Sequence, residues 1–255
     1  MRRKTLSVKI GKVFIGSDHS IKTQSMTTAS TMDTDKSVDE AIRIIQAGGK
    51  LVRFTAPNIN EAKNLLNIKD ALVAKGYDDP LVADIHFTPN AALEASKIVE
   101  KVRINPGNYV DKKKFEVKEY DEKSYQDELL KIEEKFIPLI NSCKKNNVAM
   151  RIGTNHGSLS DRVMNRFGDT PLGMVESAME FLRICKQNEY DQIVLSMKSS
   201  NPIVMIHAYR LLVKSMENEN MHYPLHLGVT EAGDGLDGRI TVSYTHLRAH
   251  ETIAD

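Results

Sequence analysis

The sequence predicts a (β/α)8 TIM barrel that is incomplete at its C-terminal end. Short, continuously apolar strands alternate with amphipathic helices along most of the 255 residues, a pattern typical of a buried parallel sheet. The units recur about every 30 residues and no GxGxxG motif follows the first strand, which favours a barrel over a doubly wound sheet. About seven strands can be identified, one fewer than a closed barrel needs.

The strands are expected in the following order. Residues 5–16, TLSVKIGKVFIG, predict a small hairpin, because residues alternate on both sides of Gly11 and Lys12. Seven apolar segments then predict the strands of the barrel, at residues 21–26, 50–54, 81–85, 101–104, 148–152, 192–197 and 225–229.

The helices are expected between these strands. Several amphipathic segments begin with Asn, Asp or Thr, often followed by Pro in the first turn, and two end at Gly, as helix termini commonly do. The segments are residues 35–49, 58–76, 88–100, 170–188 and 201–219.

One connection is much longer than the others. Residues 107–147 begin with a charge-rich stretch and become helical in pattern from about residue 125. We expect a solvated insertion within one β–α unit, at about 108–147 of a barrel domain spanning 1–240. A contact surface is the less favoured interpretation.

Composition excludes several function classes. The net charge is +1, with 41% apolar and 27% charged residues, so no global field favours nucleic acid or a membrane surface. No apolar run approaches the ~20 residues of a membrane span, and the basic N-terminus lacks the apolar region of a signal peptide. We expect a cytoplasmic protein without nucleic-acid or membrane partners.

The two cysteines, Cys143 and Cys185, lie far apart within helical segments and have no CxxC spacing. We expect reduced structural thiols and no metal site in this chain.

Charged residues stand where the predicted strands end. The cations are Arg53, Arg103, Arg151 and Lys198. The active site of a barrel is built at the C-terminal ends of its strands, and guanidinium groups bind phosphate oxygens through paired N–H donors. Four converging cations predict a ligand with at least two negative charges, most simply a diphosphate. The alternative is that each arginine pairs with a neighbouring carboxylate.

Other polar residues at the same ends leave their roles open. Asp84 and Glu231 should stay ionised among cations, and could orient a hydroxyl, move a proton, or only neutralise the arginines. His86 either points into the mouth or packs behind Asp84. Asn105 and Asn155 are donors for a ligand oxygen or ordinary turn residues. The glycine-rich stretch 230–238 could present backbone N–H groups to a phosphate.

Six segments occur together in order: QSMT at 24–27, LVADIHF at 81–87, RINPGN at 103–108, RIGTNHGSL at 151–159, SMKSS at 196–200 and PLHLGVTEAG at 224–233. As a set they closely resemble the 4-hydroxy-3-methylbut-2-enyl diphosphate synthase family, from about residue 5 to Ile240. The long connection resembles the longer form found in some bacteria and in plastids, which carries an extra domain.

The resemblance implies an oxidoreductase of the non-mevalonate isoprenoid pathway that reductively opens 2-C-methyl-D-erythritol 2,4-cyclodiphosphate. It implies two electrons from ferredoxin or flavodoxin, delivered through a [4Fe-4S] cluster in a C-terminal domain, and a homodimer. Arg53, Arg103, Arg151 and Lys198 match the diphosphate-binding cations of the family. Asn155 matches a substrate contact, and Asp84 and Glu231 match the carboxylates at the barrel mouth.

The sequence also departs from the family. The eighth strand and the cluster domain are not found, and Cys143 and Cys185 do not match cluster ligands, so we expect this chain to bind substrate but not a cluster, and to be inactive alone. The final residues, 241–255, resemble the translation of a transposon-type sequencing adapter, and we expect a non-native tail.

Two other functions stay open. One is a non-redox, phosphate-binding barrel enzyme of the pterin or aldolase type, and the other is a non-catalytic anion-binding module. The family function requires a Cys-x-x-Cys motif and a third Cys with a nearby Glu beyond Ile240.

Overall fold

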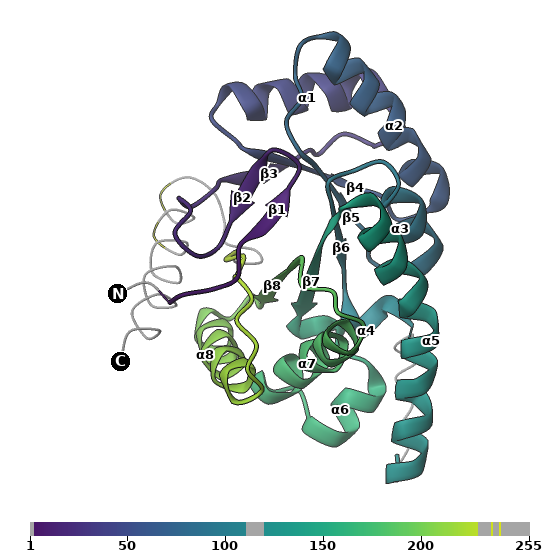
Figure 1. Ribbon diagram of the computed structural model, residues 1–255, viewed down its shortest axis with the longest axis vertical. Helices are drawn as coiled ribbons and strands as arrows, with labels where there is room; N and C mark the ends of the chain where they lie inside the picture. The colour runs from purple at the N-terminus through teal and green to yellow at the C-terminus, as the bar shows by residue number, and fades with distance from the viewer. Residues whose placement is uncertain (1–2, 111–119, 229–235, 237–239, 241–255) are drawn as a thin grey trace.

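A computed structural model describes residues 3–110, 120–228, 236 and 240. Its centre is a curled sheet of six parallel strands in chain order, β3 to β8 (Figure 1). The strands are β3 (Gln24–Met26), β4 (Leu51–Thr55), β5 (Leu81–Asp84), β6 (Lys101–Ile104), β7 (Ala149–Asn155) and β8 (Ile193–Lys198). Unbroken chain order in a parallel sheet is the topology of a barrel wall.

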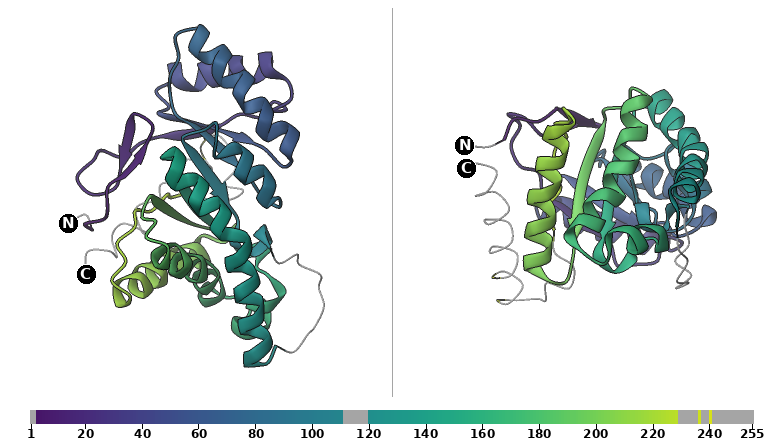
Figure 2. Two further views of the ribbon diagram at one scale, coloured as in Figure 1. Left: turned by 45° about the vertical axis from the view of Figure 1, so that its right-hand side comes forward. Right: turned by 90° about the horizontal axis from the view of Figure 1, so that it is seen from below.

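The helices form an outer layer around the curved sheet (Figure 2). They are α1 (Thr34–Gln46), α2 (Ile59–Ala74), α3 (Pro89–Ala95), α4 (Pro106–Tyr109), α5 (Glu122–Asn146), α6 (Asp161–Phe167), α7 (Pro171–Gln187) and α8 (Pro202–Asn218). The 3-10 turn η1 (His156–Ser158) follows β7. Among the described residues, this layer contains no helix long and apolar enough to cross a membrane.

Helix termini follow the expected signals. Asn58 and Asn201 cap α2 and α8 through their side chains, and Pro202 stands in the first turn of α8. Gly48 and Gly76 have positive φ after α1 and α2, the backbone state that glycine adopts without strain. Only α3 is clearly shorter than predicted, since residues 96–98 form a turn.

The predicted fold class is confirmed. The hairpin consists of β1 (Val8–Ile10) and β2 (Val13–Ile15), paired antiparallel about the turn at Gly11. Of the segment predicted as a strand at 225–229, residues 225–228 are described, and they make one parallel bridge, Leu195 to Leu225. Residue 229 lies outside the described part of the chain, so the seventh strand stays a prediction.

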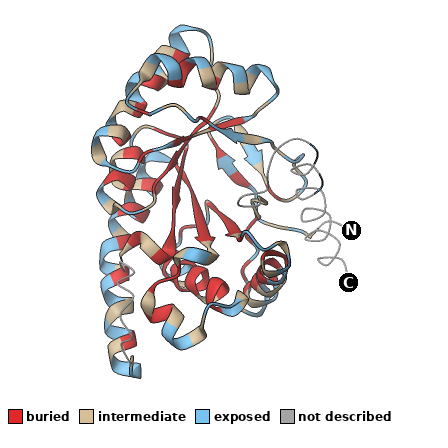
Figure 3. Cartoon of the chain, turned by 180° about the vertical axis from the view of Figure 1, so that it is seen from behind, coloured by how far each residue is buried: buried red, intermediate tan, exposed pale blue. Residues whose placement is uncertain are grey.

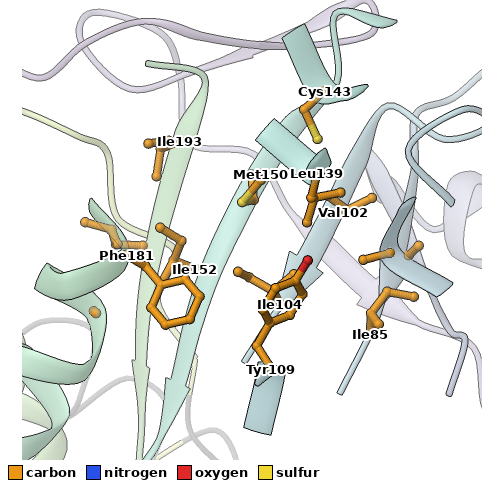
Figure 4. Close-up of a cluster of buried hydrophobic side chains, with 14 of the residues drawn as sticks. Ile85, Val102, Ile104, Tyr109, Leu139, Cys143, Met150, Ile152, Phe181 and Ile193 are labelled. Atoms are coloured by element: carbon orange, nitrogen blue, oxygen red, sulfur yellow. The ribbon is translucent and has the colours of Figure 1, made fainter. Parts of the chain in front are cut away.

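Two apolar clusters stabilise the barrel. The larger lies between the outer face of the sheet and the helices, where buried residues concentrate (Figure 3). Figure 4 shows part of it, with Ile104, Ile152 and Phe181 in one group. The smaller cluster joins the hairpin residues Val8 and Ile10 to residues near the beginnings of four strands, Leu51, Val82, Ala149 and Val194. The hairpin therefore packs against the N-terminal end of the barrel, and the opposite end is left for a ligand.

Helix α5 corrects the expectation of a solvated insertion. Its residues Ile132, Phe136, Leu139, Ile140 and Cys143 are buried in the main core. They recur at helical spacing, whereas the charged residues between them face outward. From residue 122 onward the connection is thus a covering helix of the barrel. Residues 111–119, the charge-rich stretch, lie outside the described residues.

Candidate functional site

Five consecutive strands each place at least one charged residue inside the barrel. These residues are Arg53 on β4, Asp84 on β5, Arg103 on β6, Arg151 on β7 and Lys198 on β8. Side chains alternate along a strand, so residues two apart face the same side. Three residues of the smaller apolar cluster stand two positions before a charged residue of their own strand. They are Leu51 before Arg53, Val82 before Asp84 and Ala149 before Arg151. The charged residues therefore form the next layer toward the mouth.

Asp84 is the carboxylate around which this layer is organised. Its Oδ1 accepts a hydrogen bond from Arg103 at 2.8 Å, and its Oδ2 lies 3.4 Å from Arg53 Nε. Burial alone would raise the pKa of Asp84. The hydrogen bond with His86 and the charges of Arg103, Arg151 and Arg53 outweigh burial and hold that pKa well below its usual range. Asp84 is consequently an ionised acceptor at neutral pH.

Arg103 is held in place on two sides. One end of its guanidinium contacts Asp84, and the other donates to the carbonyl of Gly153 at 2.9 Å. Gly153 is required there, because a Cβ at this position would lie 2.7 Å from Arg103 Nε. That Nε is buried and has no hydrogen-bond partner among the described residues.

Arg53 contacts the edge strand of the sheet. It lies 3.0 and 3.2 Å from the sulfur of Met26 on β3, through NH2 and Nε. Burial lowers the pKa of Arg53, the Asp84 charge raises it, and Arg103 lowers it further. The cluster thus shares one carboxylate between two arginines.

Arg151 is a deeply buried cation with little compensation in the described site. Its side chain is 1% exposed, and its hydrogen bond to Ser196 Oγ is long, at 3.4 Å. Its Nε is buried without a partner among the described residues. Burial first, and then the charge of Arg103, lower the pKa of Arg151 to about 9. A buried guanidinium without a carboxylate contact is costly, and a bound anion would supply the missing charge.

Lys198 ends β8 at the same mouth. Burial, followed by the charges of Arg151, Arg53 and Arg103, lowers the pKa of Lys198 to about 7, against the raising effect of Asp84. Its strand position pairs with Asn155 at the end of β7. Asn155 Oδ1 is buried without a hydrogen-bond partner among the described residues. An acceptor and a cation therefore stand side by side at the rim.

The two remaining polar residues also take part in the mouth. His86 Nε2 lies 2.9 Å from Arg103 NH1 and 3.3 Å from Asp84 Oδ1, and the side chain is one-third exposed. Of the two alternatives for His86, the position in the mouth is therefore the observed one. Asn105 is 1% exposed and donates through Nδ2 to Ser158 Oγ at 2.8 Å.

Two motifs of the sequence meet at this contact. Asn105 and Gly107 belong to the segment 103–108, and Ser158 belongs to the segment 151–159. A Cβ at Gly107 would lie 1.7 Å from the carbonyl oxygen of Ser158, so only glycine permits this approach. The loops after β6 and β7 are fixed together beside Arg103 and Arg151.

Glu231 and the glycine-rich stretch 230–238 fall in a region that is mostly outside the described residues. The carboxylate role expected of Glu231 therefore stays a prediction, as does phosphate binding by that loop. Asp84 is the predicted carboxylate that the structure places among the cations.

Sequence reasoning missed two interior residues. Lys101 is 2% exposed and donates to Gln24 Oε1 at 2.8 Å. Burial and the charges of Arg151 and Arg53 hold the pKa of Lys101 well below its ordinary value. His226 lies beside the start of β8, and burial together with four cations keeps its pKa well below 6.5. The alternation Lys101-x-Arg103 could have revealed the first, since both residues share one face.

The cysteines lie away from this mouth, on α5 and α7. Both are buried, and burial raises the pKa of Cys143 to about 12. No group of three or more His, Cys, Asp or Glu that could hold a metal occurs in the described ranges. The described residues therefore do not fit an iron-sulfur cluster, and no reaction step is assigned to one.

The fold and the mouth define a parallel α/β barrel whose strands carry, among the described residues, an excess of buried cations. The chain belongs to the GcpE TIM-barrel domain family, whose model matches residues 5–247. The match extends past Ile240, so the start of the non-native tail at 241 stays a prediction.

Curated relatives carry one name. The chain is 58% identical to 4-hydroxy-3-methylbut-2-en-1-yl diphosphate synthase (flavodoxin) of Parabacteroides distasonis, over 94% of this chain and 39% of that protein. It is 57% identical to the protein of the same name from Protochlamydia amoebophila, over 94% of this chain and 37% of that protein. The chain thus spans well under half the length of these relatives.

Solved structures show the fold alone. Yersinia pestis dihydropteroate synthase matches with a TM-score of 0.53 and 12% identity, over 98% of this chain and 87% of that one. Type I 3-dehydroquinate dehydratase from Clostridium difficile matches with a TM-score of 0.54 and 13% identity, over 91% and 82%. At such low identity the likeness supports the barrel architecture and no particular chemistry.

Proposed function

We propose that this chain is the substrate-binding barrel of an enzyme that reductively opens 2-C-methyl-D-erythritol 2,4-cyclodiphosphate to 4-hydroxy-3-methylbut-2-enyl diphosphate in the non-mevalonate isoprenoid pathway. The relatives' names and the family match support this function. The observation that carries the anion-binding part is Arg151, a guanidinium that is 1% exposed and whose one hydrogen bond among the described residues goes to a serine hydroxyl.

Electrostatics favour a ligand with two or more negative charges. Among the described residues, Arg53, Arg103 and Arg151 face one ionised carboxylate, Asp84, and the pKa of Lys198 is lowered to about 7. The excess of two to three positive charges accounts for the lowered pKa values of Arg151 and Lys198. A diphosphate would neutralise this excess positive charge. Its oxygens would accept hydrogen bonds from the buried N–H groups that lack partners among the described residues.

The residues then divide into two roles. Arg53, Arg103, Arg151 and Lys198 would hold the diphosphate, and Asn105 and Asn155 would contact ligand oxygens or hydroxyls. Because Asp84 is ionised, it suits accepting a hydrogen bond from a substrate hydroxyl better than delivering a proton. His86 would position Arg103 and Asp84, which it contacts. Proton delivery is left to Glu231 as a prediction.

The two electrons require a redox partner outside this barrel. We propose a [4Fe-4S] cluster in the longer protein, which would pass on single electrons, and flavodoxin as the donor, as the relatives' names suggest; ferredoxin is the other donor expected. A homodimer, a cytoplasmic location and the inactivity of the barrel alone stay predictions.

Calorimetry with the cyclodiphosphate and with inorganic diphosphate tests the binding site. Arg103→Ala and Lys198→Ala should each weaken binding more than tenfold, which corresponds to about 1.4 kcal/mol or more. The matched control is Lys12→Ala, a cation of the hairpin turn at the other end of the barrel, which pairs with Asp78 and Asp79. If all three variants bound diphosphate as tightly as the unaltered chain does, the proposed anion site would be wrong.

Sequencing the gene past the codon for Ile240 tests the redox part. The proposal requires a Cys-x-x-Cys motif and a third Cys with a nearby Glu downstream. An open frame without these residues would favour the non-redox, phosphate-binding enzyme instead.

A further inference from the structure

The amine of Lys198 has an unusual setting. It lies at the C-terminal end of β8, and no hydrogen bond or ion pair of this amine is found among the described residues. Its stem runs along Gly228, where an added Cβ would lie 3.3 Å from Cε and 3.5 Å from Nζ. This glycine leaves the space that the lysine occupies, so the amine is packed on one side and faces the mouth on the other.

Among the described residues, the groups that act electrostatically on this amine are nearly all cationic or neutral. They are Arg53 on β4, Arg103 on β6, Arg151 on β7 and the buried His226, with Asp84 as the opposing charge. Their repulsion and burial lower the pKa of Lys198 to about 7. An ordinary lysine has a pKa of about 10.4 and is almost fully protonated at neutral pH. Near pH 7 Lys198 therefore offers far more of the unprotonated, nucleophilic amine than an ordinary lysine does.

The same mouth holds the groups that would anchor a phosphate. Ser196, two residues before Lys198 on β8, contacts Arg151, and Arg103 contacts Gly153, which pairs with Ser196. With a rise of about 3.3 Å per residue, the backbone of Lys198 lies roughly 7 Å nearer the rim than that of Ser196. A small molecule whose phosphate rests on the guanidinium groups can thus bring a carbonyl group toward the amine.

We propose that Lys198 forms an imine with phosphorylated aldehydes that dock through their phosphate on the arginines of the mouth. The amine nitrogen adds to the carbonyl carbon, and the carbinolamine then loses water to give C=N. The two N–H protons and the carbonyl oxygen leave together as that water, so no oxidant or reductant is consumed. This reactivity goes beyond the ring-opening function, but it rests on the same proposed anion site.

Pyridoxal 5′-phosphate is the probe, because it carries an aldehyde and a phosphate on one small ring. The chain is incubated with it, the imine is reduced with borohydride, and the modified lysine is located by peptide mass spectrometry. We expect Lys198 to be modified about tenfold more than any other lysine, with an initial rate that rises through pH 7. We also expect pyridoxal, which lacks the phosphate, to modify it about tenfold less, and inorganic diphosphate to protect it.

Two variants separate the amine from the anchor. Lys198→Arg keeps the cation and should lose the modification, and Arg151→Met keeps the amine and should reduce it about tenfold. The proposal is overturned when pyridoxal and its phosphate modify Lys198 equally, or when modification spreads over exposed lysines. Since the site is mapped in the unaltered chain, this outcome does not depend on the folding of a variant.

Diphosphate calorimetry distinguishes the two proposals. If diphosphate binds but Lys198 is not modified, the anion site is supported and the proposal of an imine is overturned. Absence of both would overturn the imine and the diphosphate site together.

Discussion

Asp84 and Arg103 occupy paired positions on neighbouring strands, and their side chains meet at 2.8 Å inside the barrel. Both are nearly inaccessible, with side chains 6% and 4% exposed. The carboxylate therefore serves the folded state as the counter-charge of an otherwise cationic layer. A diphosphate would compete with that carboxylate for the same guanidinium groups.

The variant Asp84→Asn should separate these two effects. We expect the free energy of unfolding at pH 7 to fall by roughly 3 kcal/mol, because the buried arginines lose their counter-charge. Inorganic diphosphate should bind more tightly, since the net positive charge rises, whereas the cyclodiphosphate should gain less because it loses a hydroxyl acceptor. Urea unfolding and calorimetry measure the two quantities.

The control is Asp78→Asn, an exposed carboxylate that pairs with Lys12. The dependence of stability on pH in the acid range gives a second check. Since the pKa of Asp84 is depressed in the folded state, its contribution is present above the unfolded pKa of about 3.9 and is lost as the pH falls through the lower folded value. Asp84→Asn should accordingly lose less stability in acid than the unaltered chain does.

Gly153→Ala should disturb the site by displacing Arg103. A Cβ there would lie 2.7 Å from Arg103 Nε and 3.1 Å from Ser196 Oγ, so the guanidinium has to shift. We expect diphosphate affinity to fall about tenfold. Gly157→Ala is the matched control, because nothing lies within 4 Å of an added Cβ at that position. Equal affinities in the two variants would show that Arg103 does not need its observed position.

Much of the fold could be predicted because it depends on local periodicity. Apolar runs indicate the parallel strands, and capping residues and glycines indicate where the helices between them begin and end. Helix α5 was misread because its charged outer face masks the buried residues Ile132, Phe136 and Leu139. The segment from 225 pairs with β8 as expected of the next strand, but its described residues form only the bridge at Leu225.

The positions of Arg53, Arg103, Arg151 and Lys198 on barrel strands could be predicted, because each charge interrupts an apolar segment. Only Lys198 ends its strand as expected, whereas the other three stand third in theirs. Lys101 escaped notice because it begins its strand and because its one polar partner among the described residues, Gln24, lies 77 residues earlier in the chain. Contacts of this kind depend on strand order, which no local pattern encodes. Similarly, the choice between the two roles of His86 required the actual distance to Arg103.

Sulfate affinity should depend on pH through Lys198. Sulfate stays a dianion between pH 6 and pH 8, so changes in its binding reflect the protein. Because the pKa of Lys198 is about 7 in the free chain, its positive charge is lost across this range and sulfate should bind several-fold more weakly at pH 8 than at pH 6. The arginine of Lys198→Arg should keep its charge, so the sulfate affinity of this variant should not change between pH 6 and pH 8. If the affinity still changed with pH in this variant, another group would be responsible for the titration.

Lys101→Met should stabilise the chain at pH 7 by about 1 kcal/mol, because a buried amine with one partner is replaced by an apolar side chain of similar length. The pKa of Lys101 is lowered in the folded state. Between that lowered value and the unfolded pKa of about 10.4, Lys101 is therefore protonated more in the unfolded chain than in the folded chain. Stability of the unaltered chain should therefore rise with pH up to that value, and the advantage of the variant should shrink. Lys50→Met, at an exposed lysine beside β4, controls for lost surface charge in urea unfolding at each pH.

Glu180→Gln should weaken the outer layer without touching the mouth. Glu180 on α7 accepts from Arg162 of α6 at 2.6 and 2.7 Å and from the hydroxyl of Tyr125 on α5. The carboxylate and the guanidinium are 5% and 2% exposed, so removing the negative charge leaves a buried cation and should cost roughly 3 kcal/mol.

Urea unfolding measures this loss, with Glu128→Gln of the exposed pair with Lys131 as the control. The double variant Arg162→Met, Glu180→Leu should recover most of the stability, since it removes both charges together. Diphosphate affinity should be the same in every one of these variants. A drop in affinity in Glu180→Gln would mean that the helical layer positions the cations, because the network has no contact with the barrel mouth among the described residues.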